Sequence, residues 1–113
     1  MKGGRDMVAV GLHWYRTEEG KKYWIVSKTT DGKTVETADT GKSLEEILED
    51  LSKINDKVVI GFDSWGGKMA VEAIANFVSK RNNMKITLEG LTGEYKAKVS
   101  AEQLAVNALK RFE

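Results

Sequence analysis

A nearly continuous apolar run, Lys57-Val58-Val59-Ile60-Gly61-Phe62-Asp63, lies in the middle of the chain between two stretches with helical spacing. A strand that is apolar on both sides suits the centre of a sheet whose two faces are both covered. Such a strand needs helices packed on the sheet. The run therefore predicts an α/β fold.

The segments before this run predict three antiparallel strands. Residues 7–16 alternate apolar and small or polar side chains with the period of two that is typical of a strand. Residues 23–30 and 33–39 indicate two further strands. Asp31-Gly32 lies between them and suits a tight type I′ hairpin turn, because that turn needs positive φ angles.

Apolar residues recur at helical spacing over 44–54, 70–78 and 104–112, which predicts three amphipathic helices. Ser43-Leu44-Glu45-Glu46 has the Ser-x-x-Glu form of a capping box at the start of the first helix. Ser100 is expected to cap the last helix.

The remaining segments complete one sheet. Residues 84–88 alternate as a fifth strand, 90–93 suit a turn, and 95–99 read as a short extended segment. Strands that are joined through helices must pair in parallel. The sequence predicts one mixed sheet flanked by helices.

Composition limits the class of protein. The 113 residues are 41% hydrophobic and 31% charged, so one globular domain over residues 1–113 is expected rather than a disordered chain. The net charge of +1 excludes a strongly basic nucleic-acid-binding protein, so any such contact must be local, for example at Lys80-Arg81 with Lys85. The absence of cysteine excludes disulfides and thiolate chemistry. No apolar run is long enough for a membrane span, and we expect a cytoplasmic protein.

Two strands end alike, in Gly11-Leu12-His13 and Gly61-Phe62-Asp63. If the two strands are parallel neighbours, His13 and Asp63 lie side by side near the carboxyl ends of the strands. Sheets of α/β proteins usually bind their ligands at that edge. The pair therefore indicates a candidate site.

Three motifs in the chain resemble ribonuclease H. Asp63-Ser64 ends an apolar strand and leads into a helix, as the strand-terminal aspartate of that family does. Gly90-Leu91-Thr92-Gly93 resembles its Gly-His-x-Gly loop, and Ala101-Glu102-Gln103-Leu104-Ala105 resembles the Ala-Asp-x-Leu-Ala start of its final helix. The order of elements also agrees. The resemblance covers nearly the whole chain and implies a ribonuclease H-like fold, a five-stranded mixed sheet in which the strand with Val10 lies between those with Val26 and Ile60.

The resemblance also implies an activity. The family cleaves the RNA strand of an RNA/DNA hybrid with two metal ions that are held by four carboxylates. Asp63 and Glu46 match two of these carboxylates, and Glu102 matches a third with one extra methylene. His13 stands where the family has the aspartate that bridges both metals, and Leu91 replaces the family's mobile histidine.

These departures favour impaired or absent cleavage. Mg²⁺ prefers oxygen ligands in an octahedron, whereas imidazole suits softer ions, so we expect Mg²⁺ to bind weakly and Mn²⁺ to bind better at His13. The first hypothesis is a degenerate ribonuclease H-like domain that binds an RNA/DNA hybrid, structured RNA or a protein partner. A divergent metal-dependent nuclease that uses Glu46, Asp63 and Glu102 is the second. The third is an assembly or regulatory protein whose Trp14, Trp24 and Trp65 form a contact surface.

Each site residue also has a purely structural interpretation. Glu46 is then only the partner of Ser43 in the capping box. Asp63 caps the helix that follows it, and Glu102 is an acid favoured in the first helical turn by the helix dipole. His13 is an ordinary hydrogen-bonded residue. The site hypothesis depends on these residues converging in space.

Overall fold

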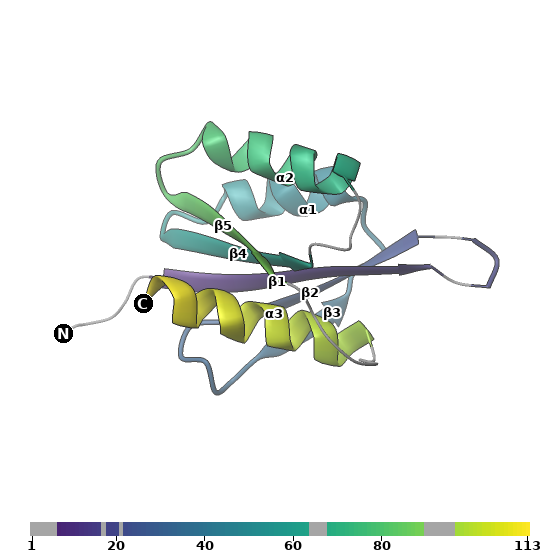
Figure 1. Ribbon diagram of the computed structural model, residues 1–113, viewed down its shortest axis with the longest axis horizontal. Helices are drawn as coiled ribbons and strands as arrows, with labels where there is room; N and C mark the ends of the chain where they lie inside the picture. The colour runs from purple at the N-terminus through teal and green to yellow at the C-terminus, as the bar shows by residue number, and fades with distance from the viewer. Residues whose placement is uncertain (1–6, 17, 21, 64–67, 90–96) are drawn as a thin grey trace.

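The computed structural model describes residues 7–16, 18–20, 22–63, 68–89 and 97–113 of the chain (Figure 1). None of the helices in these ranges is long and apolar enough to cross a membrane. In chain order the elements are β1 (Met7–Arg16), β2 (Lys22–Thr29), β3 (Glu36–Asp39), α1 (Leu44–Ser52), β4 (Lys57–Asp63), α2 (Lys68–Ser79), β5 (Met84–Glu89) and α3 (Ala97–Phe112).

The strands form one mixed sheet in the order β3-β2-β1-β4-β5. β1 pairs with β2 in antiparallel and with β4 in parallel orientation, and β4 pairs in parallel with β5. The strand with Val10 therefore lies between those with Val26 and Ile60, and this prediction is confirmed.

Helices cover both faces of the sheet, as the apolar run of β4 predicts. Figure 1 shows α1 and α2 on one face and α3 on the other. The face below α1 and α2 holds the larger apolar cluster, in which the rings of Trp24 and Phe62 stack with their centroids 5.9 Å apart. Phe62 and Leu12 are fully buried there. This cluster is the main hydrophobic core.

On the opposite face, α3 packs its backbone directly against the sheet. Gly11 and Gly61 are register partners in the middle of this face. A Cβ atom built on Gly11 would lie 2.0 Å from the carbonyl oxygen of Ala101, and one built on Gly61 would lie 2.3 Å from that of Leu104. Only glycine fits at these two positions, because a side chain would have to push the helix away.

The connection between β2 and β3 is longer than the predicted hairpin. The strand expected from residue 33 begins only at Glu36, so the two-residue type I′ turn is wrong. Gly32 does have a positive φ of 79°. The carboxylate of Asp31 accepts hydrogen bonds from the N–H groups of Lys33 and Thr34, both at 2.8 Å. These bonds stabilise a wider loop in place of the tight turn.

The start of the last helix also differs from the prediction. α3 begins at Ala97, so the extended segment predicted over 95–99 is wrong from that residue on. Ser100 lies inside the helix with 2% exposure and is not its N-cap. A short apolar alternation cannot separate a strand from a first helical turn. Ser100 and Ala101 are buried in the folded protein, and this burial favours a helix over an extended segment here.

Candidate functional site

The two strand ends that look alike in the sequence lie side by side. Leu12 and Phe62 are register partners in the parallel pair β1–β4, which places the following residues, His13 and Asp63, next to each other. His13 Nδ1 is 3.9 Å from Asp63 Oδ2, and the side chains are 19% and 13% exposed. The matched glycines and strand ends thus produce a largely buried histidine–carboxylate pair.

The electrostatics of the pair favour a neutral imidazole. Burial lowers the pKa of His13, and the negative charge of Asp63 opposes that shift only in part. Nδ1 of His13 is buried and has no hydrogen-bond partner among the described residues. The pair therefore presents one ring nitrogen and one carboxylate, rather than two carboxylates, at this edge of the sheet.

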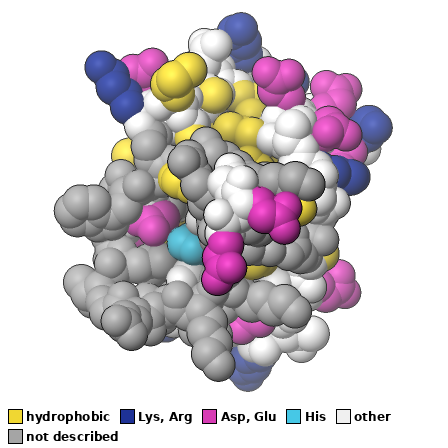
Figure 2. Space-filling view, turned by 90° about the vertical axis from the view of Figure 1, so that its right-hand side faces the viewer, with side chains coloured by type: hydrophobic (Ala, Val, Ile, Leu, Met, Phe, Trp, Pro, Cys, Tyr) yellow, Lys and Arg dark blue, Asp and Glu magenta, His cyan; other side chains and the backbone are white. Residues whose placement is uncertain are grey.

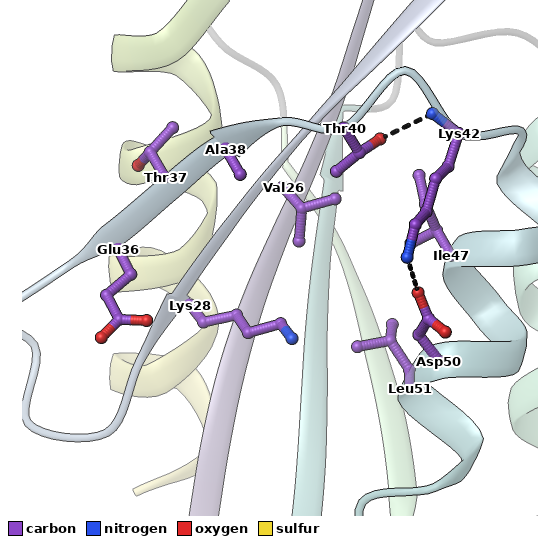
Figure 3. Close-up of a pocket in the computed structure, with 10 residues that line it drawn as sticks. All are labelled: Val26, Lys28, Glu36, Thr37, Ala38, Thr40, Lys42, Ile47, Asp50 and Leu51. Atoms are coloured by element: carbon purple, nitrogen blue, oxygen red, sulfur yellow. Dashed lines mark hydrogen bonds and ion pairs between the residues drawn. The ribbon is translucent and has the colours of Figure 1, made fainter.

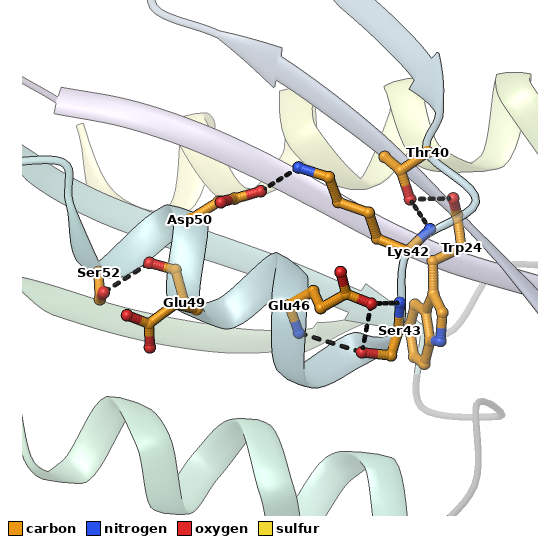
Figure 4. Close-up of polar contacts among 8 residues, drawn as sticks. All are labelled: Trp24, Thr40, Lys42, Ser43, Glu46, Glu49, Asp50 and Ser52. Carbon is orange, nitrogen blue, oxygen red and sulfur yellow. Dashed lines mark hydrogen bonds and ion pairs between the residues drawn. The ribbon is translucent and has the colours of Figure 1, made fainter.

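Glu46 is held at the start of α1 by Ser43 (Figure 4). The Ser43 backbone N–H and hydroxyl both donate to Glu46 Oε1, and the Glu46 N–H donates to Ser43 Oγ, each at 3.2 Å. This is the capping box that the sequence predicts, and it is confirmed. The exposed Glu46 carboxylate is therefore engaged locally.

Glu102 connects α3 to the edge strand β3. Its carboxylate accepts a hydrogen bond of 3.2 Å from the Thr37 hydroxyl, which also bonds to the hydroxyl of Ser27 at 2.7 Å. Because α3 begins at Ala97, Glu102 does not belong to the first helical turn, and that structural interpretation is wrong. The carboxylate of Glu102 instead ends a series of hydrogen bonds that runs from Ser27 on β2 through Thr37 on β3 to α3.

The described residues do not assemble the ligand set that two Mg²⁺ ions need. No group of three or more His, Asp or Glu side chains in the described ranges is placed to hold a metal ion. His13 and Asp63 form a pair, and one imidazole with one carboxylate is not the oxygen-rich octahedron that Mg²⁺ demands.

Sequence reasoning missed Glu89, a buried carboxylate at the end of β5. Glu89 is the register partner of Asp63, so it extends the row of polar side chains from β1 across β4 to β5. It is 7% exposed and accepts hydrogen bonds of 2.8 Å from Thr87 Oγ1 and from Arg111 Nε. Figure 2 looks onto this end of the molecule and shows the chain's one histidine among acidic side chains.

A sequence signal for Glu89 was present. Met84, Ile86 and Leu88 alternate along β5, which puts Glu89 on the opposite side of that strand. Register with β4 then decides that this side is shared with Asp63. The alternation of side chains along one strand does not show how that strand is aligned with its neighbour.

The structure also places two of the three tryptophans and Arg81 of the basic cluster. Trp24 is 4% exposed, and Trp14 is partly buried and packs against the main core, so neither supports a tryptophan contact surface. The guanidinium of Arg81 lies 3.7 Å from the centroid of the Phe77 ring. Trp65 and Leu91 lie outside the described residues.

A separate groove of about 330 Å³ lies between α1 and the strands β2 and β3 (Figure 3). Val26, Ile47 and Leu51 form its apolar floor, and an ion pair between Lys42 and Asp50 closes one side. Its charged lining residues are balanced in sign. The groove belongs to the α1 face and is separate from the His13–Asp63 pair.

No protein-family model matches the chain, and no match is found among curated proteins or solved structures.

Proposed function

We propose that the chain is a degenerate ribonuclease H-like domain that binds nucleic acid, an RNA/DNA hybrid or structured RNA, with impaired or no cleavage. The strand order β3-β2-β1-β4-β5, with one helix opposite the other two, supports this proposal because the resemblance implies the same order. The parallel neighbours β1 and β4 bring a polar pair to the edge where such sheets bind ligands.

The observation that carries the loss of cleavage is the identity of that pair. Two-metal hydrolysis needs clustered carboxylates, since the metals activate water and stabilise the leaving oxygen. Here His13 stands beside Asp63, while Glu46 is engaged by Ser43 and Glu102 by Thr37. A neutral imidazole supplies no negative charge for a bridging position. This arrangement supports the part of the proposal that concerns impaired cleavage.

A binding experiment tests this proposal. An RNA/DNA hybrid, an RNA duplex and an unrelated polyanion such as heparin are titrated at two salt concentrations. We expect the hybrid or the RNA duplex to bind more tightly than the polyanion at both, because shape contributes beyond charge. Equal affinity for all three, with the same salt dependence, would reject nucleic-acid recognition.

A repair experiment tests the site. His13→Asp should strengthen Mg²⁺ binding, lower the melting temperature in chelator and restore it with Mg²⁺, because clustered acids repel one another without metal. Hybrid cleavage is not expected from His13→Asp alone, because the Glu102 carboxylate bonds to Thr37 on the edge strand instead of joining the pair. His13→Asn is the matched control without charge. If His13→Asp leaves the metal dependence of melting unchanged, His13 does not occupy the metal position.

A divergent Mn²⁺-dependent nuclease is the second candidate. It is favoured by the buried Nδ1 of His13, which lies 3.9 Å from a carboxylate oxygen of Asp63 and lacks a hydrogen-bond partner among described residues. Nitrogen ligation suits Mn²⁺ better than Mg²⁺. Calorimetry should give Mg²⁺ affinity on the order of millimolar or weaker and tighter Mn²⁺ binding that Asp63→Asn abolishes. Tight Mg²⁺ binding would contradict both candidate functions, because each expects the site to bind Mg²⁺ weakly.

A further inference from the structure

A second polar hollow lies between the end of α3 and β5, one strand away from Asp63. It has a volume of about 510 Å³, and the residues that line it are Glu89, Asn107, Lys110 and Arg111. The last three share one face of α3, because they are spaced by three and four residues. The hollow opens to solvent, and its only acidic lining residue within the described ranges is Glu89.

The charge of Glu89 is already neutralised within the protein. Its Oε2 accepts from Arg111 Nε and Thr87 Oγ1, both at 2.8 Å, and its Oε1 accepts from Arg111 Nη2 at 3.4 Å. The side chain of Glu89 is 8% exposed, whereas the side chain of Arg111 is 61% exposed. The buried carboxylate therefore fixes one edge of the guanidinium, and the remaining N–H donors of Arg111 stay available at its exposed side.

Asn107 and Lys110 add donors to the same hollow. Gln103 Nε2 donates to Asn107 Oδ1 at 2.8 Å, which leaves the amide N–H groups of Asn107 to face other partners. Lys110 is exposed and contributes an ammonium group. The lining thus offers donors from an amide, an ammonium and a pre-oriented guanidinium, with two cations against one paired carboxylate.

We infer that this hollow, defined by Asn107, Lys110 and Arg111, binds a phosphate group. A phosphate carries negative charge and several acceptor oxygens, which match the donors of Asn107, Lys110 and Arg111, while the one lining carboxylate, Glu89, is already paired with Arg111. The phosphate can come from a nucleic-acid backbone or from free phosphate. The nucleic-acid source rests on the proposed function. A nucleic-acid backbone bound in the hollow would run near the His13–Asp63 pair, because Glu89 and Asp63 lie on neighbouring β-strands, which are about 4.8 Å apart.

Inorganic phosphate is the first probe. In a nuclear magnetic resonance titration, the side-chain amide of Asn107 and the Nε–H of Arg111 should shift saturably, whereas the amide of Asn76 on α2 should not. Asn107→Ala should weaken the response of Arg111 at least severalfold, and alanine is a better helix former than asparagine, so the variant should fold. Unshifted Asn107 and Arg111 signals at tens of millimolar phosphate would overturn the inference.

An oligonucleotide hybrid is the second probe. Lys110→Gln should weaken hybrid binding severalfold and reduce the slope of log affinity against log salt by about one, as loss of one phosphate contact does. Lys53→Gln, the same charge change at the end of α1, is the matched control and should leave both unchanged. Arg111 itself is kept, because its removal would leave Glu89 buried and unpaired.

The two probes separate the inference from the proposed function. Phosphate shifts at Asn107 and Arg111 without any hybrid binding support the phosphate site and reject nucleic-acid recognition. Hybrid binding that Lys110→Gln and Asn107→Ala both leave intact, with melting temperatures confirming folded variants, overturns the site and leaves the proposed function standing.

Discussion

The two faces of the sheet are built in different ways. Below α1 and α2, large side chains such as Phe62, Leu12 and Trp24 fill the space between sheet and helices. Below α3, Gly11 and Gly61 let the helix backbone approach the strands directly. Both faces bury apolar side chains, but on the α3 face these are mostly small, as in the cluster of Ala9, Val59, Ala108 and Leu109, so that the helix backbone comes close to the strands.

Polar contacts differ between the faces as well. α3 is tied to both edges of the sheet, near its start through Glu102 and Thr37 and near its end through Arg111 and Glu89. The side chains of Ser27 and Thr37 complete the first tie. α3 is therefore held by directional side-chain contacts at both sheet edges in addition to its close packing on the strands.

The largest effect is expected on the α3 face. Gly11→Ala should cost roughly 5 kcal/mol or more of unfolding free energy, because the atom that a Cβ would meet at 2.0 Å is a backbone oxygen of α3. Gly20→Ala is the control: its φ is 86° but nothing lies within 4 Å, so about 1–2 kcal/mol is expected. Denaturant unfolding measures both. A small loss for Gly11→Ala would mean that α3 is not seated on β1.

The main core should respond to lost volume. Phe62→Ala should cost about 4 kcal/mol, the usual range for a fully buried phenylalanine, because it removes the ring that stacks on Trp24 and leaves a cavity. Leu88→Ala, at a residue that is 47% exposed, should cost less than roughly 1 kcal/mol. Equal losses at both positions in thermal melts would contradict the placement of the core.

Loss of the hydrogen bond between Thr37 and Glu102 should lower the free energy of unfolding by a smaller amount. Thr37→Val keeps the shape but removes the hydroxyl between Ser27 and Glu102, so we expect a loss of roughly 1–3 kcal/mol. Thr34→Val changes an exposed threonine in the preceding loop and should be nearly neutral. Urea unfolding of the two variants compares them. An unchanged free energy of unfolding for Thr37→Val would show that the hydrogen bonds of Thr37 to Ser27 and Glu102 do not stabilise the protein.

The smallest effect is the pH dependence from His13. Burial lowers its pKa in the folded state below the value near 6.5 of the unfolded chain, so the unfolded chain binds more protons as the pH falls. Stability should therefore decline as the pH drops through about 6.5 toward the folded-state pKa. His13→Gln should lack this decline between about pH 7.5 and 5.5, as followed by urea unfolding. A wild-type protein that is more stable at the lower pH would contradict a lowered pKa of His13 in the folded state.

Parts of the candidate site could be predicted from local sequence. The capping box of Ser43 and Glu46 is local, because its partners are three residues apart, and it forms as predicted. The neighbourhood of His13 and Asp63 followed from the matching ends of two strands once parallel pairing was expected. Glu102 was expected near that pair, but it bonds to Thr37 on the edge strand. Its partner depends on how α3 crosses the sheet.

Local sequence was enough to predict most strand and helix periods and the burial of β4 on both faces. These follow from local side-chain patterns, whose period is fixed by backbone geometry. The position of Gly11 and Gly61 beneath α3, and of Glu89 beside Asp63 and bonded to Arg111, follows from the folded arrangement of the elements. Those contacts join residues far apart in the chain, because strand register and helix crossing, rather than local pattern, bring them together.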